Sequence, residues 1–209
     1  MRKGLFISVE GSDGSGKSTQ IENIKRFFEN KGINIIFTRE PGGTVIGEKL
    51  REIILDKGLA EMSDMTEALL YAAARAQHVA QVIRPALEKG KIVVCDRFVD
   101  SSIAYQGYGR GLGEPVRVIN EYAIAGCLPD VTFLMKMDPR IGRRRIKPEQ
   151  QDRLEREEDD FHLRTFEGYL ELERRYPERI VSIDASRSIE EIKLDIYSKL
   201  EEMLKGVSK

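Results

Sequence analysis

The sequence predicts an α/β protein with three layers, a five-stranded parallel sheet flanked by helices on both sides. Short apolar runs rich in β-branched residues alternate along the chain with stretches whose apolar residues recur at helical spacing. These runs are apolar on both faces, as expected for parallel strands that crossover helices cover. The runs occupy residues 4–10, 34–40, 91–97, 131–137 and 179–184. Because no internal repeat or low-complexity linker interrupts the sequence, we expect a single domain over residues 1–209.

The first run leads into the glycine-rich segment EGSDGSGKST and then into a stretch with helical spacing. Gly11, Gly16, Lys17 and Ser18 fit the pattern G-x-x-x-x-G-K-[ST]. In this pattern, called a P-loop, backbone amides surround a polyphosphate, the lysine neutralises its outer phosphates and the hydroxyl binds Mg²⁺. The helix that follows adds an N-terminus, which favours anions. The segment therefore predicts a nucleotide site.

Charged residues lie at the ends of the apolar runs or directly after them. Because the carboxyl ends of parallel strands meet at one edge of the sheet, these residues should converge on the glycine-rich segment. Asp96 ends the run 91–97 and is expected to complete the Mg²⁺ site with Ser18, as an acidic residue on the neighbouring strand does in P-loop proteins. Arg97 comes next and is suited to bind the phosphate of an acceptor. The residues expected at this edge are Glu10, Arg39, Glu40, Asp96, Arg97, Asp138 and Asp184.

A helical stretch begins at Asp64, where Asp64 and Glu67 have the spacing of a capping box. Tyr71 and Arg75 lie one turn apart on one face of this helix. Together they suit a base that stacks on the ring and accepts a hydrogen bond from the guanidinium. The residues alone favour ordinary packing with a surface charge. His78, which has no second metal ligand at a suitable spacing, is expected to be structural.

Residues 140–153 form a segment unusually rich in cations. Like charges this close repel one another, so the segment is suited to an anion. In phosphoryl transfer, a mobile arginine segment, or lid, neutralises the transferred group and excludes water. The alternatives are a solvated face or ion pairs with the acidic run at 155–160. The cations are Arg140, Arg143, Arg144, Arg145, Lys147 and Arg153.

The composition limits the classes of protein. With 34 basic and 35 acidic side chains, the net charge of −1 gives no basic field for extended nucleic-acid binding. No apolar run is long enough to span a membrane, and the opening MRKGLFISV is too short for a signal peptide, so we expect a cytoplasmic location. Cys95 and Cys127 lack metal-ligand spacing and are expected to be inert thiols.

Several kinds of P-loop protein remain open at this point. A guanine-nucleotide switch is disfavoured, because the one Asn-Lys pair, at residues 30–31, continues as Gly-Ile and not as the N-K-x-D of such proteins. Two groups of arginines suggest two anionic substrates, and therefore a kinase. A deoxynucleotide or nucleoside kinase and a nucleotide-binding or switch protein without catalysis both remain open.

Five segments resemble those of thymidylate kinases of the bacterial kind, in the same order and at about the same spacing. They are EGSDGSGKST, TREPGGT, RAQH, CDRFVDSSIAYQG and DRLEREEDDFH. The resemblance extends from residue 5 to about 185, and DRFVDSSIAYQG is its most specific part. It implies transfer of the γ-phosphoryl group of MgATP to dTMP, giving dTDP and ADP, by a homodimer. The ATP site implied comprises Gly11, Ser12, Asp13, Gly14, Ser15, Gly16, Lys17, Ser18 and Thr19.

The resemblance also implies a dTMP site. Arg51 and Arg97 would bind the acceptor phosphate, Asp13 the 3′-hydroxyl, and Tyr105 would crowd the ribose 2′ position. For the base, the resemblance reverses the expectation from the residues alone. It places thymine on a tyrosine beside an arginine, with two further polar side chains one helical turn apart at its edge. These base-binding residues are Tyr71, Arg75, Ser102 and Gln106, and the resemblance adds Glu40 to the dTMP site.

One departure concerns catalysis. Where thymidylate kinases of the eukaryotic kind carry an arginine in the loop, this chain has Gly14. The resemblance then implies that the catalytic arginine comes from the lid, as Arg143, Arg145 or Arg153, beside the catalytic residues Lys17, Asp96 and Arg97.

Overall fold

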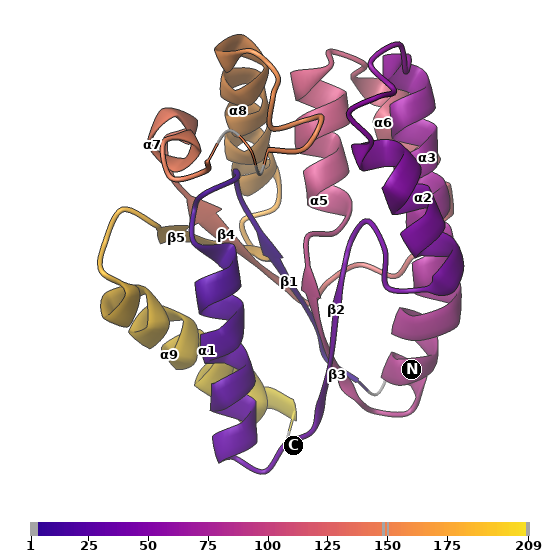
Figure 1. The fold of residues 1–209 in the computed structure, drawn as a ribbon. Helices are drawn as coiled ribbons and strands as arrows, with labels where there is room; N and C mark the ends of the chain where they lie inside the picture. The colour runs from indigo at the N-terminus through magenta and orange to yellow at the C-terminus, as the bar shows by residue number, and fades with distance from the viewer. Residues whose placement is uncertain (1–3, 148, 150, 208–209) are drawn as a thin grey trace.

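Five strands form one parallel sheet at the centre of the computed structural model, which describes residues 4–147, 149 and 151–207 (Figure 1). The strands are β1 (Phe6–Glu10), β2 (Ile35–Arg39), β3 (Ile92–Asp96), β4 (Val131–Lys136) and β5 (Ile180–Asp184), in the order β2-β3-β1-β4-β5. All four pairings are parallel. The five strands lie within the five runs expected from the sequence, so the predicted fold class is confirmed.

Helices cover both faces of the sheet (Figure 1). Buried residues of α1 and α9 share one core cluster with the strands, and buried residues from η1, α4 and α5 share another on the opposite face. The helices are α1 (Lys17–Asn30), α2 (Val45–Leu55), α3 (Asp64–His78), α4 (Arg84–Glu88), α5 (Val99–Ser102), α6 (Glu114–Ile124), α7 (Pro139–Arg143), α8 (Asp159–Arg175) and α9 (Ile189–Val207). Two π-helical segments, η1 (Val79–Ile83) and η2 (Ile103–Gly109), extend α3 and α5.

Alternate residues of the strands pack into opposite cores. In β1, Phe6 packs with Phe98 and Leu87, whereas its neighbour Ile7 packs with Ile24 on the side of α1. Both β1 residues are fully buried. The strands therefore need apolar residues at successive positions, which is the pattern from which they were predicted.

The strand order brings two chain segments together at the carboxyl edge of the sheet. After β1 the chain crosses to β2 at the edge of the sheet, and β3 then returns to lie between them. Val9 and Asp96 are register partners, so the ends of β1 and β3 lie side by side. Ligands of open parallel sheets bind at such a position.

The start of α3 differs from the prediction. Ser63 is the N-cap, with its side chain accepting from Thr66 N at 3.2 Å, so the predicted capping box of Asp64 and Glu67 is wrong. Glu67 is instead fully buried. It accepts hydrogen bonds from side chains far away in the sequence, and therefore has a tertiary role.

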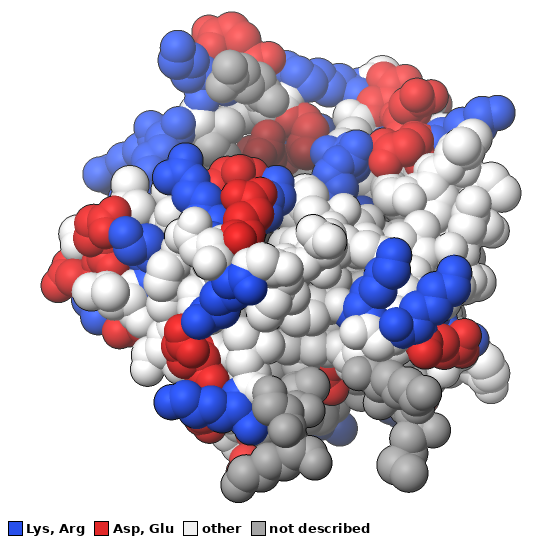
Figure 2. All heavy atoms as spheres, turned by 90° about the horizontal axis from the view of Figure 1, so that it is seen from below, with Lys and Arg blue, Asp and Glu red and all other residues white. Residues whose placement is uncertain are grey.

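The thiols and the surface fit the composition. Cys95 and Cys127 are buried, and burial raises the pKa of the Cys95 thiol, as expected for an inert group. On the face seen from below, basic and acidic side chains lie interspersed among the described residues (Figure 2). None of the helices within residues 4–147 and 151–207 is long and apolar enough to cross a membrane.

Candidate functional site

The glycine-rich loop connects β1 to α1. Gly11, Gly14 and Gly16 have φ angles of 136°, 74° and 89°, which residues with a Cβ rarely adopt. The first turn of α1 contains no acidic residue, and its N-cap, Gly16, makes no side-chain cap. The amides at this helix end are therefore available to an anion.

Lys17 folds back over the loop. Its Nζ donates to the carbonyl oxygens of Gly11 at 2.9 Å and Ser12 at 2.8 Å. Burial, together with the neighbouring Arg97 cation, lowers the pKa of Lys17 to about 8. A polyphosphate at this position would favour the charged form of the lysine.

Two glycines bring the loop into close contact with the segment that follows β4. A Cβ on Gly14 would lie 2.1 Å from the carbonyl oxygen of Gly142 in α7, and a Cβ on Gly142 would lie 2.3 Å from that of Asp13. This contact explains why the loop carries no arginine at position 14, because a larger side chain would meet the backbone of α7.

Asp96 and Ser18 line the same cavity as Lys17. The Oδ1 atom of Asp96 is buried and has no hydrogen-bond partner among the described residues. An unpaired buried carboxylate oxygen is costly and is suited to a cation. In the described ranges 4–147, 149 and 151–207, no group of three or more His, Cys, Asp or Glu side chains is placed to hold a metal. The donor set fits Mg²⁺ that takes its remaining ligands from phosphates and water.

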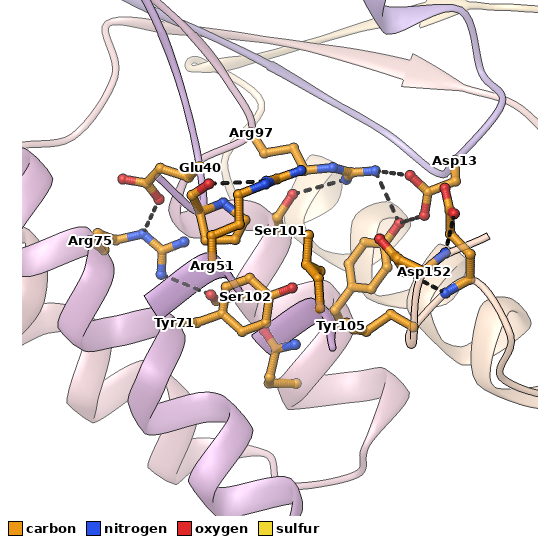
Figure 3. A pocket seen from close by; sticks show the side chains of 15 residues that line it. Asp13, Glu40, Arg51, Tyr71, Arg75, Arg97, Ser101, Ser102, Tyr105 and Asp152 are labelled. Carbon is orange, nitrogen blue, oxygen red and sulfur yellow. Dashed lines mark hydrogen bonds and ion pairs between the residues drawn. The ribbon is translucent and has the colours of Figure 1, made fainter. Parts of the chain in front are cut away.

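Arg97 follows β3 with a φ of 63°, and its side chain extends toward the glycine-rich loop (Figure 3). Its guanidinium forms an ion pair with Asp13 and donates to the carbonyl oxygen of Gly11 at 3.0 Å. Although burial of the Asp13 carboxyl opposes it, the Arg97 and Lys17 cations lower the pKa of Asp13 to about 2. Asp13 is therefore ionised at neutral pH.

A second cavity adjoins the first. It is lined by every residue that the resemblance assigns to the dTMP site (Figure 3). The two cavities share Asp13, Glu40, Arg51, Arg97 and Glu155. The side chains of α3 line one side of the second cavity, and those that follow β3 line the other. The nine assigned residues brought together are Asp13, Glu40, Arg51, Tyr71, Arg75, Arg97, Ser102, Tyr105 and Gln106.

Arg75 is the largest of the fully buried side chains in this set, with 1% of its surface exposed. Its Nε donates to Glu40 Oε2 at 2.7 Å, and its Nη1 donates to Ser102 Oγ at 2.8 Å. The guanidinium also donates to the Phe98 carbonyl oxygen at 3.1 Å. Arg75 therefore holds three chain segments together as well as facing the cavity, a structural role that the sequence does not predict.

Three further residues of the cavity have defined partners. The Tyr105 hydroxyl donates to Asp13 Oδ2 at 2.8 Å, and Gln106 Nε2 donates to Glu67 Oε1 at 2.8 Å. Arg51 donates to the Pro41 carbonyl oxygen at 3.0 Å. Ser102 ends α5 and Gln106 lies in the π-helical η2, so the expected single helix changes form between them, yet both line the cavity. His78 is buried against Glu40 and Thr38, as expected for a structural histidine.

The three candidate arginines of the lid lie in different places. Arg145 donates to the Gly14 carbonyl oxygen at 3.2 Å and lines the cavity of the glycine-rich loop. Arg143 instead pairs with Asp159 of the acidic run. Arg153 donates to Ile54 O at 2.9 Å and to Glu67 Oε2 at 2.6 Å. Residues 148 and 150 of the predicted lid lie outside the described residues.

Sequence reasoning missed several residues of the site. Asp152 and Glu155 line the second cavity and cap one another, each accepting from the backbone N–H of the other at 2.9 Å. Their D-x-x-E spacing was a usable signal. Ser101 lies beside Arg97, and Tyr169 reaches the same point from α8. Tyr169 has no local signal, because only the fold brings α8 to this position.

A family model described as thymidylate kinase matches residues 9–196. The chain belongs to the thymidylate kinase family. Among curated family members, a thymidylate kinase of Halalkalibacterium halodurans is 47% identical over 208 residues, covering 98% of this chain and 99% of that protein. One of Exiguobacterium is 49% identical over 210 residues, covering 99% of each. The crystal structure of thymidylate kinase from Ehrlichia chaffeensis superposes with a TM-score of 0.77 at 32% identity, covering 95% of this chain and 98% of that one.

Proposed function

We propose that this protein transfers the γ-phosphoryl group of ATP to dTMP, giving dTDP and ADP. The observation that carries the proposal is the pair of adjoining cavities that share Asp13 and Arg97, one at the glycine-rich loop and one lined by all nine residues assigned to dTMP. Membership of the thymidylate kinase family over nearly the whole chain supports the same reaction.

The loop amides and Lys17 bind the phosphates of ATP, while Arg51 and Arg97 bind the phosphate of dTMP from the other side. The acceptor already carries an anionic oxygen, so the reaction needs no strong general base. Catalysis depends on alignment of the two phosphates and on neutralisation of their charge. Among the lid arginines, Arg145 is our candidate for the catalytic one, because it lies at the loop and the other two candidates are engaged elsewhere.

Tyr71 stacks on the thymine base, and Arg75, Ser102 and Gln106 bind its polar edge. Ser102 and Gln106 also hydrogen-bond to buried charged groups, which fixes their orientation. Tyr105 and Asp13, which are hydrogen-bonded to each other, face the sugar. A ribose 2′-hydroxyl would meet the Tyr105 ring, and this contact favours deoxyribose.

Ser18 and Asp96 are the residues that would hold Mg²⁺. When bound, the ion would neutralise part of the phosphate charge. The buried, unpaired Asp96 Oδ1 supports this assignment.

The assembly that we propose is a homodimer. Large apolar side chains are exposed on α2, α3 and α6, and α3 packs against both of the other helices. The apolar helical segments after residues 66 and 116, which the sequence offers as possible interfaces, lie on α3 and α6. The exposed residues are Ile46, Ile53, Met65, Leu69, Val118 and Tyr122. Analytical ultracentrifugation tests this assembly, and Tyr122→Glu should shift the protein to the monomer. A single domain, a cytoplasmic location and the absence of nucleic-acid or membrane partners remain predictions.

The decisive experiment measures ADP release from MgATP with dTMP, dUMP, dCMP, dGMP, UMP, thymidine and no acceptor, side by side. We expect turnover that requires dTMP and falls sharply for ribose and purine acceptors. Lys17→Ala should abolish turnover while leaving the circular dichroism spectrum unchanged. ADP release that is indifferent to the acceptor would contradict the proposal and indicate an ATPase or a switch. Preference for another monophosphate would indicate a different nucleotide kinase.

A further inference from the structure

Glu10 ends β1, directly before the glycine-rich loop, and is completely buried. It lines neither of the two cavities of the candidate site. Three donors from separate positions converge on its carboxylate. The Phe98 backbone N–H donates to Oε1 at 2.6 Å, while the hydroxyls of Ser101 and Tyr169 donate to Oε2 at 2.5 Å and 3.2 Å. Burial and the nearby Asp100 carboxylate raise the pKa of Glu10 to about 7.

The same two hydroxyls accept hydrogen bonds from Arg97. Its Nη1 lies 3.2 Å from Ser101 Oγ and 3.3 Å from the Tyr169 hydroxyl. A hydroxyl has one hydrogen and two lone pairs. Because Glu10 accepts the hydrogens, directly or through the 2.9 Å contact between the two hydroxyls, the lone pairs face the guanidinium. Two hydrogen-bonded paths, one through each hydroxyl, therefore connect the Arg97 cation to the Glu10 carboxylate.

Glu10 also fixes the backbone next to Arg97. The φ of 63° at Arg97 is in the left-handed region, which a residue with a Cβ rarely adopts. The hydrogen bond from Phe98 N to Glu10 follows this residue directly, and Arg97 N donates to Val9 O at 3.0 Å on its other side. The backbone at Arg97 is thus held from both sides by the end of β1.

Other charged groups do not replace Glu10 in this role. Asp100 forms a bidentate ion pair with Arg179, with distances of 2.6 Å and 2.8 Å. Asp13 binds the opposite nitrogen of the Arg97 guanidinium, on the side of the cavities. Glu10 is therefore the carboxylate that accepts from Arg97 through hydroxyls on its buried side.

We infer that Glu10 is a positioning residue that aims the Arg97 guanidinium at the acceptor phosphate through Ser101 and Tyr169. The inference rests on the proposed function, because it takes Arg97 to bind that phosphate. Its consequence is specific to the phosphate. Loss of Glu10 should weaken the binding of dTMP and leave the binding of thymidine, which has no phosphate, nearly unchanged.

The variant Glu10→Gln retains an acceptor for Phe98 N. Its amide N–H₂, however, donates to Ser101, so that the hydroxyl must turn and Arg97 loses an acceptor. We expect the dissociation constant of dTMP to rise about tenfold, the size of one lost charge-assisted hydrogen bond, while that of thymidine changes less than about twofold. Tyr169→Phe, which retains Glu10 and removes only one hydroxyl, should change dTMP binding in the same direction by less.

The experiment measures the dissociation constants of dTMP and thymidine by calorimetry for the wild type, these two variants, Arg97→Ala and a matched control. The control is Asp130→Asn. Asp130 Oδ2 accepts from Phe6 N at 2.7 Å at the opposite end of β1, so this variant also changes a carboxylate bonded to the strand. Its ratio of dTMP to thymidine affinity should equal that of the wild type. Urea unfolding of each variant checks that it is folded.

The outcomes separate the inference from the proposed function. An unchanged affinity ratio in Arg97→Ala would overturn the role of Arg97 and the inference with it. A reduced ratio in Arg97→Ala, with unchanged ratios in Glu10→Gln and Tyr169→Phe, would overturn only the role of Glu10. Equal losses of dTMP and thymidine binding in Glu10→Gln would show general structural support, which also contradicts the inference.

Discussion

Arg153 donates a hydrogen bond from Nη2 to Oε2 of Glu67 at 2.6 Å, and this ion pair ties the end of the lid segment to α3. Glu67 is fully buried and also accepts from Arg110 at 2.9 Å. These cations, together with Gln106, lower the pKa of Glu67 despite its burial. Arg153 therefore has the geometry of an anchor for the lid.

Glu67→Gln should lower the free energy of unfolding by about 3 kcal/mol, because it leaves two guanidinium groups without their shared carboxylate. Urea denaturation measures this loss. The matched control is Glu114→Gln, which removes a carboxylate from an exposed ion pair with Arg117 and should leave the midpoint nearly unchanged. Equal effects in the two variants would mean that the Glu67 cluster contributes no more than a surface pair.

Gly142→Ala should weaken ATP binding about tenfold while the protein stays folded. The new Cβ would lie 2.3 Å from the Asp13 carbonyl oxygen, so the glycine-rich loop must move, and small displacements of a binding loop are costly. Calorimetric titration with ATP measures the effect. In the control Gly107→Ala, the nearest atom lies 3.8 Å from the added Cβ, and ATP binding should not change. Wild-type affinity in Gly142→Ala would show that the loop adapts without loss.

Arg75→Ala should reduce both stability and dTMP binding. The resemblance implies a residue that binds the base, but the structure also buries the guanidinium against Glu40, Ser102 and Phe98. Removal leaves the Glu40 carboxylate without its cation, which should cost about 3–5 kcal/mol. The double variant Glu40→Gln with Arg75→Ala should recover part of this stability in urea unfolding. If dTMP binding weakens in Arg75→Ala with no loss of stability, binding of the base is the main role of Arg75.

The sequence predicts the sheet well, and it places Asp96 and Arg97 at the carboxyl edge, because both depend on local patterns. Asp138 and Asp184, which were expected at the same edge, line neither cavity of the candidate site. Buried parallel strands need apolar residues at successive positions, and Asp96 and Arg97 are placed by the end of their strand. The contacts of Glu67 depend instead on Arg110 and Arg153, which lie 43 and 86 residues away along the chain. The local spacing of Asp64 and Glu67 instead predicted that this glutamate belongs to a capping box.

The lid arginines show the same limit. Arg143, Arg145 and Arg153 are equivalent in a local pattern, since each lies in one short basic segment. Their different positions depend on the close contact between Gly14 and Gly142, which brings the segment to the loop. They also depend on carboxylates of α8 and α3, which form ion pairs with Arg143 and Arg153. Only the tertiary structure contains this information.

The affinity for ATP should fall by up to about tenfold per pH unit above pH 8. Lys17, with a pKa of about 8 in the free protein, is neutral above that pH, whereas bound phosphates favour its charged form. Binding at pH 9 must therefore take up a proton, and binding at pH 6.5 must not. Calorimetry in two buffers with different ionisation enthalpies measures this uptake. In Lys17→Arg, which stays charged at both values of pH, the uptake at pH 9 should disappear. The same uptake in that variant would assign the proton to another group.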